Sequence, residues 1–221
     1  IVNYVKKYHP ELSDNLAPVV SPVVALSRVL KHDYNDKYNL VFIGPCVAKK
    51  DESDEIDSVI TFSELRKFLQ DSNINPENSQ ASEFDPPHSG RGAIFPISRG
   101  LIQTINMHEN LFEGNLVVAE GRENFKDALQ EFDTGLINDH HLELLCCEGC
   151  IMGAGMTGIG KRYEKRAYIT NYVKNKLNKM DTAQWKKQME RYKDLDLSRT
   201  FSPDDQRVKT PSMQEIEALW N

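Results

Sequence analysis

The chain has 221 residues, of which 39% are apolar and 27% charged, with a formal net charge of -6 and a pI near 5.6. This length provides one sizeable apolar core or two smaller lobes without disulfides. The net negative charge argues against a nucleic-acid partner, and the apolar runs are too short for a membrane span, which needs about 20 residues.

Two helices in the first half are predicted by the residues that begin them. Ser21 followed by Pro22 is typical of an N-cap with proline at the first helical position, and predicts a helix to about Tyr34. Thr61 and Glu64, three residues apart, predict a capping box at the start of a second helix. We expect the apolar side chains of this second helix to be buried, namely Phe62, Leu65 and Leu69.

Short apolar runs predict the strands, and apolar stripes with helical spacing predict the remaining helices. The expected strands are 40–43, 93–97, 116–119 and 142–145. The other expected helices are 1–9, 98–107, 125–136, 161–177, 182–192 and 212–220, the last with Ser212 and Glu215 as its capping box.

Strands that alternate with helices indicate an α/β fold, in which ligands bind beyond the carboxyl ends of strands. We expect four segments along the chain. They are a first lobe segment at 1–70, a long loop or lobe seam at 71–92, a second lobe at 93–160 and a helical C-terminal segment at 161–221. The loop is expected because 71–92 is rich in Asn, Ser, Pro and Gly.

All the cysteines lie in two segments, each placed directly after a predicted strand. They are Cys46 in the first segment and Cys146, Cys147 and Cys150 in the second. This clustering and the absence of a signal peptide argue against a disulfide framework, so we expect reduced thiols in a cytoplasmic protein. Gly153 and Gly155 follow at once, and would let the backbone approach whatever the thiols bind.

Three interpretations of these thiols are open. Buried structural cysteines are one, although three cysteines within five residues beside glycines argue against it. A zinc site with four thiolates is the second, and the adjacent pair Cys146 and Cys147 fits tetrahedral geometry poorly. An iron-sulfur centre whose remaining ligand lies elsewhere is the third.

Three stretches resemble the FeFe hydrogenase catalytic domain. GPCVAKKDE, which contains Cys46, resembles the second cysteine signature of that family, and LLCCEGCIMGAGM, which contains Cys150, resembles the third. The opening YHPELSDNLAPVVSP is similar to the segment that follows the first signature. The resemblance runs from residue 1 to about 158. It implies a two-lobed domain with short, mainly parallel sheets flanked by helices and a cluster site between the lobes, and it implies that the chain is a fragment of a longer protein.

The resemblance also implies roles for individual residues. Cys46 matches a ligand of the 4Fe-4S cubane of the H-cluster, and Cys150 matches the cysteine that links this cubane to a two-iron subcluster. Lys49 matches a lysine that hydrogen-bonds a cyanide of the two-iron unit. The remaining ligand is Cys146 by the spacing of the catalytic enzymes and Cys147 by that of the sensory members, and we favour Cys147. Gly153 and Gly155 would wrap the cofactor, and Glu52 would orient its loop by a salt bridge.

The chain also departs from the family's efficient enzymes. Gly44 and Leu144 stand where those enzymes have methionine, and Val23 where they have glutamine. Ala17 replaces the serine of their proton path, and an alanine cannot relay a proton. These departures resemble the sensory branch, which implies hydrogen sensing or reversible hydrogen oxidation at low turnover in an anaerobe.

The sensory branch implies partners as well. They are upstream ferredoxin-like clusters, downstream signalling modules such as PAS, kinase or phosphatase domains, and a ferredoxin-type electron partner. The main alternative to a hydrogenase function is a non-catalytic iron-sulfur module for redox sensing or electron transfer. A zinc-stabilised interaction domain ranks third. Purified in air, the 221 residues alone are expected to lack the H-cluster.

Two further patterns are not expected to carry function. Residues 153–158 fit GxGxxG and residues 155–161 fit GxxxxGK, but Arg162 stands where a phosphate loop needs serine or threonine to hold magnesium. His140 and His141 lie in a polar turn, where histidines are usually only solvated.

Overall fold

The computed structural model describes residues 1–35, 37–107, 110, 112, 114–158, 160–208 and 210–219. The chain divides into two compact units. One is Val20–Leu197 and the other combines Ile1–Val19 with Ser198–Asn221. The boundaries of these two units differ from the expected boundaries at 70, 92 and 160. The predicted lobes therefore remain a prediction.

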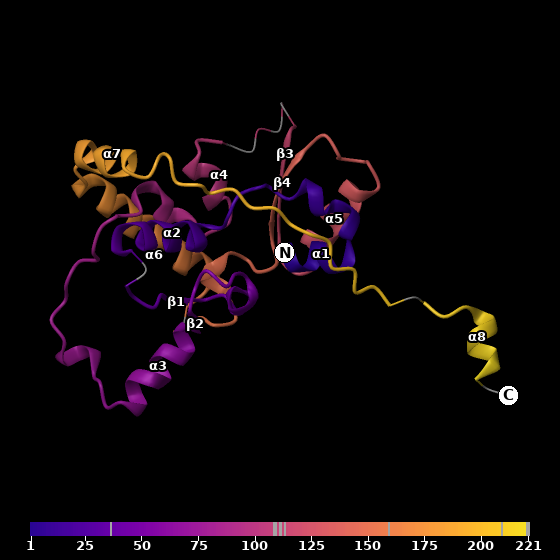
Figure 1. The fold of residues 1–221 in the computed structure, drawn as a ribbon, viewed down its shortest axis with the longest axis horizontal. Helices are drawn as coiled ribbons and strands as arrows, with labels where there is room; N and C mark the ends of the chain where they lie inside the picture. The colour runs from indigo at the N-terminus through magenta and orange to yellow at the C-terminus, as the bar shows by residue number, and fades with distance from the viewer. Residues whose placement is uncertain are drawn as a thin grey trace. The chain divides into compact units, whose positions relative to one another are not determined.

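The described residues contain the elements labelled in Figure 1. The helices are α1 Val2–Tyr8, α2 Pro22–Tyr34, α3 Phe62–Asp71, α4 Gly100–Thr104, α5 Asn124–Asp133, α6 Arg162–Lys179, α7 Thr182–Glu190 and α8 Met213–Ala218. The strands are β1 Val41–Gly44, β2 Ser58–Thr61, β3 Leu116–Glu120 and β4 His141–Leu145.

The strands form two separate parallel pairs. β1 pairs with β2 in the register Val41 to Ser58, and β3 pairs with β4 in the register Leu116 to His141. Figure 1 shows β3 and β4 side by side, and α3 leading directly out of β2. The α/β class with short parallel sheets is therefore confirmed. Both cysteine segments begin at the carboxyl end of a strand, β1 for Cys46 and β4 for Cys146.

A small apolar cluster lies where α2 packs near the first strand pair. Its buried members are Val20, Val24 and Ile56, and the partly buried side chains around it are Val23, Ala25, Phe42 and Val59. Val24 is fully buried, which places the inner face of α2 against β1 and β2. This cluster supports the strand that ends at Cys46.

The predicted helix starts are confirmed, with one difference in detail. Thr61 and Glu64 form the capping box of α3, and Ser212 and Glu215 form that of α8. α2 begins at Pro22 as predicted, but the Ser21 hydroxyl makes no capping bond and donates to Glu52 instead. The final helix is described only to Ala218, and residue 220 lies outside the described residues.

Residues 93–97 do not form the predicted strand. They belong to a 3-10 helix and the turns after it, in which Phe95 N donates to the Gly92 carbonyl and Ile97 N to the Ile94 carbonyl. These local bonds satisfy backbone groups that a strand would need a neighbouring strand to pair. The helix expected at 98–107 is correspondingly short, since α4 covers only Gly100–Thr104.

One burial expectation and one helix end were also wrong. Phe62, Leu65 and Leu69 of α3 are only half-buried and line an open hollow of about 700 Å³ together with Met156. α5 ends at Asp133, before residue 136, and the Leu136 side chain is 74% exposed.

The smaller unit has its own backbone pairing. Val19 forms an antiparallel bridge with Ser198, and the carbonyls of Lys6 and Lys7 accept from the backbone of Asp204 and Gln206. None of the described helices is long and apolar enough to cross a membrane.

Candidate metal centre

The two cysteine segments meet in the structure. The Gly155 N–H donates to the Pro45 carbonyl at 2.8 Å, directly before Cys46 in the chain. The Gly155 carbonyl in turn accepts from the Ser63 N–H at 3.2 Å, in the first turn of α3. These hydrogen bonds hold together segments that lie about a hundred residues apart in sequence, at the carboxyl end of β1.

Glycines make this close approach possible. A Cβ at position 153 would lie 2.6 Å from the Pro45 carbonyl oxygen, and one at 155 would lie 2.5 Å from the Thr61 methyl. Gly149 has a positive φ of 84° and would place a Cβ 3.0 Å from the Pro96 carbonyl oxygen. The structure therefore gives Gly153 and Gly155 a packing role between the cysteine segments, and their contact with a cofactor stays a prediction.

The thiols of Cys46, Cys147 and Cys150 act on one another electrostatically. Burial raises the pKa of Cys150, and the charges of Cys46 and Cys147 raise it further. Burial also raises the pKa of Cys147, followed by the charges of Cys146 and Cys46. The structure thus places Cys46, Cys147 and Cys150 close enough to act on one another, and Cys146 acts on Cys147 as well.

Exposure divides the four thiols into two pairs. Cys46 and Cys150 are half-buried, whereas Cys146 and Cys147 are exposed. Such convergent thiols fit a soft metal or an iron-sulfur cluster, because a bound cation offsets the repulsion that three neighbouring thiolates would otherwise suffer. The residues present therefore fit three of the four ligands that a cubane takes.

Cations lie beside this group. Lys49 lowers the pKa of Cys150 and Arg122 lowers that of Cys147, each by its positive charge. The Lys49 ammonium is ion-paired with Glu52, which also accepts from the Ser21 hydroxyl. Lys49 and Glu52 are about one-fifth exposed, so this pair is fixed at the mouth of the site rather than free in solvent.

Arg162 connects the third cysteine segment to β3. Its guanidinium donates to Glu120, the last residue of β3, and lies 3.4 Å from Glu148, which stands between Cys147 and Cys150. From the sequence alone, Arg162 served only as evidence against a phosphate loop. In the structure, Arg162 lies at the start of α6 and holds the loop between Cys147 and Cys150 to the end of β3.

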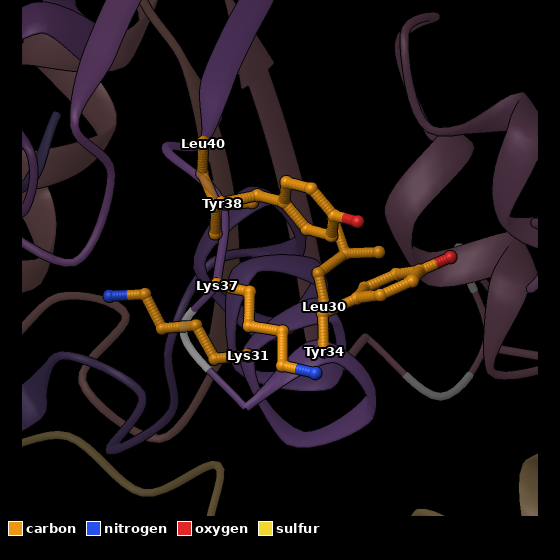
Figure 2. Close-up of a pocket in the computed structure, with 6 residues that line it drawn as sticks. All are labelled: Leu30, Lys31, Tyr34, Lys37, Tyr38 and Leu40. Carbon is orange, nitrogen blue, oxygen red and sulfur yellow. The ribbon is translucent and has the colours of Figure 1, made fainter.

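Two further candidate features have partners or linings of their own. His140 hydrogen-bonds the exposed Asp139 at 2.6 Å. A cavity of about 110 Å³ near the end of α2 is lined by Leu30, Lys31, Tyr34, Lys37, Tyr38 and Leu40. Figure 2 shows the two lysine ammonium groups pointing in different directions, so they do not converge on a common ligand there.

Comparison with known proteins identifies the family and the fold. Residues 1–154 match the family model of the iron only hydrogenase large subunit, C-terminal domain. The chain belongs to this family. Iron hydrogenase 1 of Clostridium pasteurianum is 27% identical over 212 residues, which cover 73% of this chain and 37% of that protein. The chain therefore spans somewhat more than a third of the length of this relative.

Solved structures show the same fold. An FeFe-hydrogenase variant from Chlamydomonas reinhardtii matches with a TM-score of 0.67 at 16% identity, covering 92% of this chain and 74% of that one. A structure described as revealing stepwise assembly of the FeFe-hydrogenase H-cluster matches with a TM-score of 0.65 at 15% identity, covering 94% and 74%. At these identities the likeness establishes the fold of the iron only hydrogenase domain.

Proposed function

We propose that this chain is the H-cluster domain of an FeFe hydrogenase of the sensory type, in which Cys46, Cys147 and Cys150 bind the cubane. The observation that carries the proposal is the mutual electrostatic influence of these three thiols, with Lys49 beside Cys150. When bound, the cluster would supply the reversible two-electron chemistry of dihydrogen. The fourth ligand would be a cysteine supplied from outside these 221 residues.

Lys49 has the chemistry for its proposed role. An ammonium has three N–H donors, and the ion pair with Glu52 occupies only part of them. The remaining donors can serve an anionic ligand of the two-iron unit while Glu52 and Ser21 hold the side chain in place. Lys49 would therefore orient that ligand and stabilise its charge.

The sensory assignment rests on the altered proton route. Ala17 offers no hydroxyl, so a proton cannot pass through this position. Slow hydrogen oxidation suits a sensor that reports hydrogen to other modules, and we propose the upstream ferredoxin-like clusters, the downstream signalling modules and a ferredoxin-type electron partner on this basis. A cytoplasmic location in an anaerobe completes the proposal.

The test uses the longer protein that carries this chain, matured with its two-iron unit. Lys49→Met should lower hydrogen oxidation by about 10²-fold or more, the usual effect of removing one donor to developing charge. Lys50→Met is the matched control, because the Lys50 ammonium lies 2.5 Å from Glu64 on the exposed side of the same turn.

Equal activities of the two variants would remove Lys49 from the site. A matured protein that neither binds nor turns over hydrogen would favour the alternative, a non-catalytic iron-sulfur module for redox sensing or electron transfer.

A further inference from the structure

Two glutamates on the β3–β4 pair each have one buried oxygen without a hydrogen-bond partner among the described residues. Glu143 in β4 is only 6% exposed, and the Glu120 side chain at the end of β3 is 15% exposed. Within the described residues, the Oε2 atoms of both are buried without a hydrogen-bond partner. Leaving a buried polar atom unpaired costs about 1–3 kcal/mol, and more if the group is charged. Two such oxygens on neighbouring strands therefore need an explanation.

The strand register places both carboxyl groups on the same face. Glu143 pairs with Val118 across the ladder, and Glu120 lies two residues beyond Val118. Residues two apart on a strand share a face, so Glu120 and Glu143 are diagonal neighbours. The charge of Glu120 is accordingly among those that act on Glu143.

The other groups around the two glutamates contact atoms other than the two Oε2 atoms. Backbone hydrogen bonds from Ile102 and Arg99 reach Glu143 from α4 and its N-cap, and the Arg99 charge also acts on it. Arg162 from α6 takes the Oε1 atom of Glu120. Neither set of contacts satisfies the two Oε2 atoms.

A metal ion does not fit between these oxygens. Calcium and magnesium take six or more oxygen ligands, and within the described residues no third histidine, cysteine or acidic side chain joins this pair. A proton needs only one donor and one acceptor. Burial raises the pKa of Glu143, and the charge of Glu120 adds to this against the lowering effect of the Ile102 and Arg99 contacts.

We propose that Glu120 and Glu143 form a proton-holding site, in which one proton is shared between their Oε2 atoms at neutral pH. The protonated oxygen donates and the other accepts, so both unsatisfied atoms are paired and the two residues together carry one negative charge. Arg162 balances that charge at Glu120. The arrangement follows the general behaviour of two carboxyl groups in one buried site, of which only one ionises readily.

The position of the pair suggests its use. Arg162 contacts both Glu120 and Glu148, so its side chain connects the glutamate pair to the loop between Cys147 and Cys150. Arginine does not release its own proton, and its contribution is to transmit charge between the two sites. The protonation state of the pair would thereby set the charge that Arg162 balances beside the thiols, and this use rests on the proposed function.

Infrared spectroscopy of the chain itself tests the proposal without any cluster. At pH 7 the protein should show the C=O stretch of one protonated carboxylic acid, which shifts when glutamate is labelled with carbon-13. Glu143→Gln should abolish this band. Glu123→Gln is the matched control, because its carboxylate is 78% exposed and paired with Lys126, and it should leave the band unchanged.

Stability provides the second readout. Glutamine has the shape of a protonated glutamate, so Glu143→Gln should melt at the same temperature as the wild type at pH 7, or higher. The absence of a protonated band in the wild type, its persistence in both Glu143→Gln and Glu120→Gln, or a large loss of stability in Glu143→Gln would each overturn the proposal. Iron binding by the same variants should match the wild type, which separates this proposal from the assignment of the thiols.

Discussion

The close fit of Gly155 between the cysteine segments leads to a sharp prediction. Gly155→Ala would place a methyl group 2.5 Å from the Cγ2 and 2.6 Å from the Cβ of Thr61, and 3.0 Å from the Pro45 carbonyl oxygen. Thr61 is buried and committed to the capping box of α3, so it cannot swing away at low cost. The clash must instead separate the third cysteine segment from Pro45 and Cys46.

The magnitude follows from the energetics of overpacking. An added methyl in a well-packed site costs about 1–3 kcal/mol. For a domain of this size, each kcal/mol lowers the melting temperature by about 2–4 °C. The φ of Gly155 is not in the left-handed region, so backbone strain does not add to the cost.

Urea unfolding at neutral pH under reducing conditions measures this loss. Gly92→Ala is the matched control, because no atom lies within 4 Å of its added Cβ and its φ is also ordinary. The control should be neutral or stabilise by about 0.4–1 kcal/mol through the reduced entropy of the unfolded chain. If Gly155→Ala unfolds at the same urea concentration as Gly92→Ala, the two cysteine segments are not packed together as described.

Three further predictions concern other parts of the chain. Hydrogen bonds from Lys50 and then Thr61 lower the pKa of Glu64 from 4.5 to about 2, so its contribution to stability is present above pH 4.5 and is lost as the pH falls toward 2. Glu64→Gln should flatten this part of the curve of unfolding free energy against pH, and an unchanged slope would contradict the pairing. Gly44→Met should destabilise the chain by about 1–3 kcal/mol, since its Cβ would lie 2.6 Å from the Phe42 ring, and a variant as stable as the wild type in urea would refute the contact. In the longer, cluster-loaded protein, Ala17→Ser should raise hydrogen evolution, because proton delivery contributes about 10²–10⁴ in rate, whereas an unmodified protein as fast as the efficient enzymes would show another proton route.

Local signals predicted the elements that local chemistry determines. The capping box at Thr61 and the proline at position 22 give the helix starts correctly, because a cap depends on residues within one turn. The apolar runs gave three of the four expected strands. The run at 93–97 failed because a strand also needs a partner, and this one satisfies its backbone in tight turns instead. Burial of the α3 face failed for a related reason, since apolar spacing shows which side a helix would bury and not whether another element covers it.

The sequence pointed to candidate ligands but not to the residues around them. Clustering singled out the two cysteine segments, and the family resemblance favoured Cys46, Cys147 and Cys150, whose charges act on one another in the structure. Their binding of a cluster stays a prediction. Arg162 and its two glutamate partners lie 14 and 42 residues apart in sequence, and no local pattern joins them. One signal was available for this pair, because Glu120 and Glu143 are acidic residues in mainly apolar strands, LVVAE and HLELL. A carboxyl group in such a strand is costly unless it is paired or protonated.

The central claim is that Cys46, Cys147 and Cys150 bind one cubane and that Cys146 does not. Anaerobic reconstitution of the chain with iron and sulfide, followed by iron analysis and electron paramagnetic resonance, tests this most directly. Each of the variants Cys46→Ser, Cys147→Ser and Cys150→Ser should lose most of the bound iron and the cubane signal, whereas Cys146→Ser should retain the wild-type iron content and spectrum. Loss of the cluster in Cys146→Ser with retention in Cys147→Ser would contradict the assignment, and wild-type chain that binds zinc tightly and no iron would contradict the cluster itself.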